Sequence, residues 1–141
     1  MKTVLFADDN KAIVEHCRRS LEDEGYRVLA ARDGAEAVRL FAEIGADIAV
    51  LDISMPRMSG IDALERLKEL QPRLPVILFT AYDEDCLRDR RGALAEACIE
   101  KSDDLAELKR AIERLLETYA GGTAKAVVGL GLPPSGCTVP E

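Results

Sequence analysis

The sequence has little that would direct it to a nucleic acid or to a membrane. Its 141 residues carry a formal net charge of −7, and no cluster of lysine and arginine offsets that charge locally. An acidic surface repels phosphate backbones, so we expect no nucleic-acid partner. No apolar run reaches the length of a transmembrane helix, and the first apolar run ends at Asp8, too early for a signal peptide. These absences predict a cytoplasmic protein with no membrane partner.

The sequence also lacks the paired cysteines that are typical of zinc sites and redox motifs. Its four cysteines are scattered, and none forms a CxxC pair: Cys17, Cys86, Cys98 and Cys137. In a cytosolic protein such cysteines are normally reduced. We therefore expect four thiols and no cysteine-bound metal.

The composition that is present suits one soluble globular domain. Hydrophobic residues make up 48% of the chain and charged residues 32%, and the length is enough to bury a core. Beyond residue 120 the apolar periodicity ends, and Gly, Pro and small residues take over. We expect a domain over residues 1–120 and a flexible tail over 121–141.

Apolar runs alternate with helical patterns along the domain. Five short runs predict strands at 4–7, 28–31, 48–51, 75–79 and 97–99. Apolar stripes predict helices over 13–21, 37–44, 61–70 and 105–119, and a charged segment at 83–92 predicts a shorter one. Gly25 is placed to end the first helix, Asp33 to cap the second and Ser102 to cap the last. Near-continuous apolar strands fit burial on both faces, which predicts an α/β fold with a doubly wound five-stranded parallel sheet.

Polar residues follow four of the predicted strands. They are Asp8 and Asp9 after the first strand, Asp52 after the third, Thr80 after the fourth and Lys101 after the fifth. Each alone could be a helix cap, a turn residue or a surface charge. In parallel sheets, however, ligands bind beyond the carboxyl ends of the strands. All five residues at one edge therefore predict a single functional site.

These residues carry a resemblance to a known family. The chain resembles the receiver domain of bacterial two-component response regulators, in particular single-domain, chemotaxis-type receivers, over residues 2 to about 119. The resemblance rests on Phe6-Ala7-Asp8-Asp9-Asn10, Leu51-Asp52-Ile53-Ser54-Met55-Pro56-Arg57-Met58-Ser59-Gly60, Thr80-Ala81 and Lys101. It implies a flavodoxin-like (βα)5 fold. By the same resemblance, Asp52 is the phosphoacceptor, Asp8 and Asp9 bind a divalent cation, Thr80 is the switch hydroxyl and Lys101 binds phosphate.

The chemistry of the five residues agrees with those roles. Three carboxylates in one crevice repel each other, so the ionised cluster needs a cation. Ligands that are all oxygens favour Mg²⁺. We expect Asp9 and Asp52 to bind it directly, Asp8 to act through water, and the main-chain carbonyl of Ser54 to add a ligand.

The resemblance also implies partners and an output. The phosphoryl donor would be a histidine kinase or a phosphotransfer protein, and phosphorylation would switch binding to a downstream protein whose identity the sequence leaves open. The domain would be a self-phosphorylating acceptor that can autodephosphorylate, not a turnover enzyme. Whether it forms a homodimer, and how long the phosphorylated form persists, are also left open.

Two other functions are weighed against this one. A Mg²⁺-dependent phosphatase of the haloacid dehalogenase type also uses an Asp nucleophile, but it has Asp-x-Asp after its first strand, where this chain has Asp8 and Asp9 side by side. An interaction module that no longer uses phosphorylation would not need the complete set of five residues.

Two positions depart from the usual receiver pattern. Ser102 stands where many receivers have a proline after the lysine, which puts the usual cis peptide in doubt. Cys98 stands where many have an aromatic residue that takes part in the switch. Tyr82 is our candidate to replace that aromatic, because it follows Thr80 closely and has the bulk that a thiol lacks.

Overall fold

The computed structural model describes residues 1–81 and 88–119. Strands and helices alternate along most of this chain, as the sequence predicts. In order, the elements are β1 (Thr3–Ala7), α1 (Lys11–Asp23), β2 (Arg27–Ala31), α2 (Gly34–Glu43), β3 (Ile48–Leu51), α3 (Gly60–Leu70), β4 (Val76–Thr80), the 3₁₀ helix η1 (Arg90–Leu94), β5 (Ala97–Glu100) and α5 (Ala106–Thr118).

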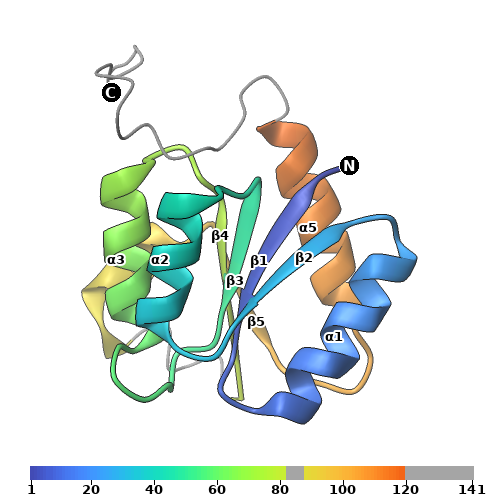
Figure 1. Ribbon diagram of the computed structural model, residues 1–141, viewed down its shortest axis with the longest axis horizontal. Coiled ribbons are helices and arrows are strands. Elements are labelled where there is room, and N and C mark those ends of the chain that lie inside the picture. The colour runs from blue at the N-terminus through green and yellow to red at the C-terminus, as the bar shows by residue number, and fades with distance from the viewer. Residues whose placement is uncertain (82–87, 120–141) are drawn as a thin grey trace.

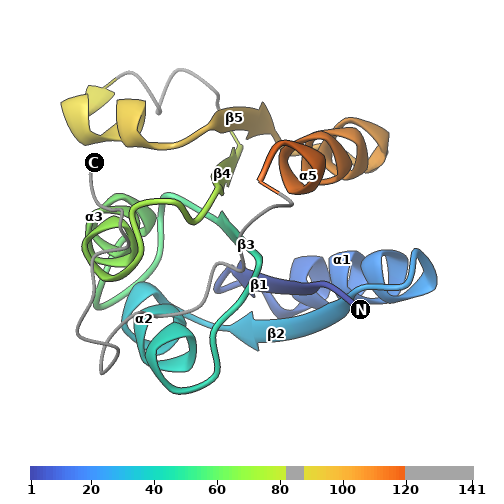
Figure 2. The same cartoon turned by 90° about the horizontal axis from the view of Figure 1, so that it is seen from above.

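The five strands form one parallel sheet in the order β2-β1-β3-β4-β5. Figure 1 shows the strands running in one direction between the helices. Seen from above, α2 and α3 cover one face of the sheet, and α1 and α5 cover the other (Figure 2). The predicted doubly wound, flavodoxin-like fold is therefore confirmed.

Alternate residues of each central strand enter two separate cores. Leu5, Leu51 and Leu78 pack toward α2 and α3. Phe6 and Val50, one position away in β1 and β3, pack toward α1 and α5. All five side chains are at most 1% exposed, because helices cover both faces. This burial explains why these strands are apolar along their whole length instead of in every second position.

Most predicted helix ends are correct, and one is not. Gly25 follows α1 with a φ of 96°, the left-handed conformation expected where a helix ends at glycine. The carboxylate of Asp33 accepts the Glu36 amide (2.8 Å) and caps α2. The prediction that Ser102 caps α5 is wrong. The Ser102 hydroxyl donates to the Asp104 carbonyl (2.7 Å), and the Asp104 carboxylate instead accepts the Ala106 amide (2.9 Å).

The region before β5 differs from the sequence prediction. Residues 90–94 form a 3₁₀ helix where we predicted the end of an α-helix over 83–92, and much of that prediction lies outside the described residues. The expectation of four reduced thiols is wrong for Cys98, which is disulfide-bonded, whereas Cys17 is a buried free thiol. Tyr82 and the predicted tail also lie outside the described residues. Within the described ranges, every peptide bond is trans, including the one before Ser102.

Candidate functional site

The sheet brings the five predicted residues to one edge. Main-chain hydrogen bonds continue the strand pairing by one residue: the Asp8 amide donates to Ala31 (3.1 Å), the Asp52 amide to Ala7 (2.9 Å) and the Lys101 amide to Thr80 (2.7 Å). The side chains therefore project from backbone that the sheet itself holds in place. Pairing of Leu51 with Leu78 places Thr80, which is 2% exposed, just beyond the end of β3.

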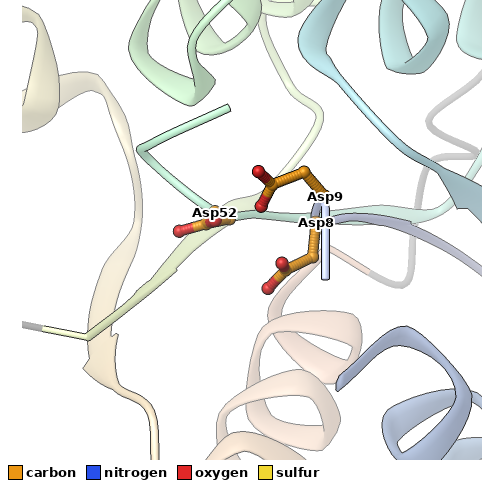
Figure 3. Close-up of side chains that lie close together, drawn as sticks. All are labelled: Asp8, Asp9 and Asp52. Carbon is orange, nitrogen blue, oxygen red and sulfur yellow. The ribbon is translucent and has the colours of Figure 1, made fainter. Parts of the chain in front are cut away.

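Asp8, Asp9 and Asp52 form an acidic cluster. One carboxylate oxygen from each lies within 4.8 Å of the others. Figure 3 shows the three side chains extending to the same side from the ends of β1 and β3. Asp8 and Asp52 are 1% and 6% exposed, whereas Asp9 is open to solvent. The cluster thus combines two buried acids with one exposed acid.

Lys101 balances part of this negative charge. Its Nζ lies 2.6 Å from Oδ2 of Asp8 and 3.4 Å from Oδ1 of Asp52. The other Asp8 oxygen accepts the Asn10 amide (2.9 Å). Lys101 is the ion-pair partner of the buried Oδ2 atom, which accepts no hydrogen bond from the described residues. One lysine among three carboxylates leaves the cluster short of positive charge.

Burial changes the acidity of Asp52 and Lys101. Burial, and then the nearby charge of Asp8, raise the pKa of Asp52 to about 6, and Lys101 and the Ser54 amide only partly oppose that rise. Burial would lower the pKa of Lys101, but its ion pairs with Asp8 and Asp52 outweigh that effect and raise the pKa. Lys101 therefore stays a cation, and Asp52 needs further positive charge to stay fully ionised near neutral pH.

The cluster suits a hard divalent cation. Three carboxylates, with a buried Asp8 oxygen that lacks a hydrogen bond, form the all-oxygen donor set that Mg²⁺ prefers. The main-chain amide of Ser54 donates to the Asp52 carboxylate. Ligation by the Ser54 carbonyl, and the division of direct and water-mediated contacts among the acids, remain predictions.

Sequence reasoning missed how tightly Gly60 packs against Asp52. A Cβ atom at residue 60 would lie 2.0 Å from the main-chain oxygen of Asp52, far inside van der Waals contact. The Gly60 amide also donates to the carbonyl of Ile53 (2.8 Å). The run from Pro56 to Gly60 predicted a loop, but only the folded chain shows that α3 begins against the backbone of Asp52.

We expect Gly60→Ala to destabilise the protein and to slow reactions at Asp52, because the β3–α3 loop has to shift to admit the methyl group. Overpacking of this kind costs about 1–3 kcal/mol of unfolding free energy. Thermal denaturation and phosphorylation assays would measure both effects. Gly25→Ala is the control: its Cβ would meet nothing within 4 Å, so it should cost some stability through its φ of 96° but leave the reaction unchanged. A Gly60→Ala variant as stable as the wild type would contradict the close packing of residue 60 against the Asp52 carbonyl.

Comparison with known proteins finds relatives among response regulators. A family model described as "Response regulator receiver domain" matches residues 4–113. The response regulator MprA of Mycobacterium sp. (strain KMS) is 41% identical over 80 residues, which are 57% of this chain and 35% of MprA. The probable transcriptional regulatory protein TcrX of Mycobacterium tuberculosis is 38% identical over 92 residues, 65% of this chain and 38% of TcrX. The chain thus spans little more than a third of the length of these relatives.

Solved structures agree with the sequence comparison. The response regulator protein TrrA of Thermotoga maritima, in complex with Mg²⁺ and BeF, superposes with a TM-score of 0.78 at 33% identity and covers 82% of this chain and 100% of TrrA. A second structure holds TrrA in complex with the histidine kinase ThkA. It gives a TM-score of 0.76 at 33% identity, with coverage of 82% and 99%.

Proposed function

The chain belongs to the response regulator receiver domain family, and from that premise we propose that Asp52 accepts a phosphoryl group with the help of Mg²⁺. The donor is a phosphohistidine of a histidine kinase or of a phosphotransfer protein. The observation that carries the proposal is the buried Asp52 carboxylate, placed beside Lys101 and within 4.8 Å of two further acids. Phosphorylation then switches the binding of a downstream protein.

Each residue has a separate part in the transfer. An oxygen of Asp52 attacks phosphorus, and the phosphorus–nitrogen bond of the phosphohistidine breaks, so that the imidazole keeps the electron pair. Lys101 supplies a fixed positive charge for the phosphoryl oxygens, in reach of Asp52 at 3.4 Å. Asp8 and Asp9 would hold Mg²⁺, with Asp52. When bound, the ion offsets the charge that gathers in the crevice.

The switch is assigned to Thr80. Its side chain is buried at the last position of β4, and the main chain there is bonded to Lys101. A phosphoryl group on Asp52 offers new acceptor oxygens for the Thr80 hydroxyl. Movement of Thr80 toward them would shift an existing conformational equilibrium of the domain.

The direct test is mass spectrometry after incubation with acetyl phosphate and Mg²⁺. A receiver should gain one phosphoryl group, and hydroxylamine should release it, because acyl phosphates react with that nucleophile. A protein that gains no group is the interaction module considered above. A protein that continuously releases phosphate from many phosphate esters is the phosphatase.

The location and partners follow the same proposal. We propose a cytoplasmic protein that a histidine kinase phosphorylates, in line with the TrrA–ThkA complex. In the described part of the chain, no helix is long and apolar enough to cross a membrane.

With a net charge of −7, this chain should give no submicromolar, salt-dependent gel shift with duplex DNA. Such a shift would contradict the proposal.

We further propose that residues 121–141 are dispensable for the domain. They lack the apolar periodicity that would compensate for the entropy lost on ordering. A chain that ends at Tyr119 should therefore keep its melting temperature and its rate of phosphorylation nearly unchanged. Calorimetry and the acetyl phosphate assay would check both, and a large loss of either would show that the tail packs on the domain.

A further inference from the structure

We infer that Arg57 is a positioning residue for the Mg²⁺ and phosphoryl site, acting through its ion pair with Asp33 at the start of α2. The inference rests on the proposed function, because Arg57 lies in the loop that carries Asp52 and Ser54. Its guanidinium Nη2 donates to Oδ2 of Asp33, 24 residues away in the sequence. The loop of the site is thus bound to a different element of the fold.

The ends of this loop are held by β1 and by α3. At its start the Asp52 amide donates to β1, and at its end the Ser59 hydroxyl accepts the Asp62 amide (3.2 Å) and caps α3. Residues 54–58 lie between these points. Their polar contacts with the start of α2 include the Arg57 ion pair and a hydrogen bond from the Gly34 amide to the Met58 carbonyl (2.9 Å), and the Met55 and Met58 side chains pack on the core beneath α2. The middle of the loop is therefore anchored to the start of α2.

Asp33 makes a firm anchor. Its side chain is only 2% exposed, whereas that of Arg57 is 73% exposed. One Asp33 oxygen accepts the Glu36 amide and the other accepts Arg57. The Glu36 amide, and to a lesser extent the Arg57 guanidinium, hold the pKa of Asp33 below its usual range. Loss of Arg57 would leave the Asp33 carboxylate with the Glu36 amide but without its cation.

The ion pair helps to hold an unusual backbone conformation at Arg57. Its φ is 65°, a left-handed conformation that is unfavourable for a residue with a Cβ atom. The Met58 amide also closes this turn on the Pro56 carbonyl (2.7 Å), so the ion pair shares the task of holding it. Without the ion pair that hydrogen bond holds the turn with less support, and any relaxation of φ would rotate residues 54–56 relative to Asp52. The Ser54 carbonyl is the predicted Mg²⁺ ligand in that segment. Residues that hold a metal ligand in position without touching the metal commonly contribute about tenfold or more to metal affinity.

The test is a calorimetric titration of the full chain with Mg²⁺ alone. Arg57→Gln keeps a residue of similar length and backbone preference but removes the charge, and we expect it to weaken Mg²⁺ binding about tenfold. Asp33→Asn keeps an oxygen for the Glu36 amide and removes only the negative charge, so it should weaken binding in the same way. Arg57→Lys keeps the cation and should restore most of the affinity.

A second readout separates positioning from catalysis. Phosphorylation of Arg57→Gln by acetyl phosphate should be slow at low Mg²⁺ and should approach the wild-type rate when Mg²⁺ saturates the site. Arg66→Gln is the matched control. Arg66 is also an exposed arginine in an ion pair, with Glu69 on the same helix (3.5 Å), and its loss should change neither quantity.

The outcomes distinguish this inference from the proposed function. Wild-type Mg²⁺ affinity in Arg57→Gln would overturn the inference, even if the melting temperature falls, because a merely structural ion pair affects stability alone. If the wild-type chain gains no phosphoryl group at Asp52, the proposed function fails. The Mg²⁺ titration would still decide the role of Arg57.

Discussion

An Asp52→Asn variant incubated with acetyl phosphate and Mg²⁺ should gain no phosphoryl group, whereas the wild-type chain should gain one. The amide that replaces the carboxylate is a poor nucleophile, and it also removes one of the three acidic groups in the cluster. Asn has nearly the same shape as Asp, so the fold should be kept. Intact-mass spectrometry measures the result, and peptide mapping of the wild-type product should place the group on Asp52.

Two further variants show whether the assay reports on this site. Lys101→Ala should still be labelled, but about 10²–10³-fold more slowly, because it loses the fixed charge that would face the phosphoryl oxygens in the proposed reaction. Asp23→Asn changes an exposed acid at the end of α1, far along the chain from the cluster, and should be labelled like the wild type. Undiminished labelling of Asp52→Asn would assign the reaction to another residue.

The same Asp52→Asn substitution should make the protein more stable at neutral pH when Mg²⁺ is absent. The folded state raises the pKa of Asp52 from 3.8 to about 6, so ionising this side chain opposes folding. Each pKa unit corresponds to about 1.4 kcal/mol, which gives an upper bound of about 3 kcal/mol. A gain of this size would raise the melting temperature by roughly 6–12 °C.

The pH dependence gives this prediction its sign. Because the folded pKa is the higher one, the folded state binds the Asp52 proton more tightly, and the wild type loses stability as pH rises from about 4 through about 6. The stability difference between Asp52→Asn and the wild type should therefore be near zero below pH 4 and complete above about pH 7.

Urea or thermal denaturation across this range in a chelating buffer would measure the difference. Added Mg²⁺ should reduce this stability difference, because the ion should bind the wild-type cluster of three carboxylates more tightly than the variant cluster of two. Asp23→Asn is again the control and should show no such pH dependence. An Asp52→Asn variant that is less stable than the wild type at pH 7.5 would contradict the prediction that the ionised Asp52 carboxylate destabilises the folded state.

The sequence by itself determined the fold class and which polar residues lie at the carboxyl edge of the sheet. Runs such as Val4–Ala7 and Ile48–Leu51 are apolar at every position, and only strands covered on both faces require this. A charged residue directly after such a run, as at Asp8 and Asp52, must lie at the carboxyl edge of the sheet. Both inferences depend on local patterns, which the chain carries whatever its distant partners are.

The tertiary structure decided which of these groups meet. Lys101 lies closer to Asp8 than to Asp52, Gly60 packs on the backbone of Asp52, and Arg57 pairs with Asp33. None of these contacts has a periodic signature, because each joins segments whose relative position is set by strand register and helix packing. The sequence specifies a contact of this kind only through the complete fold, since the same residues at the same spacing could point elsewhere if one strand shifted by a single position.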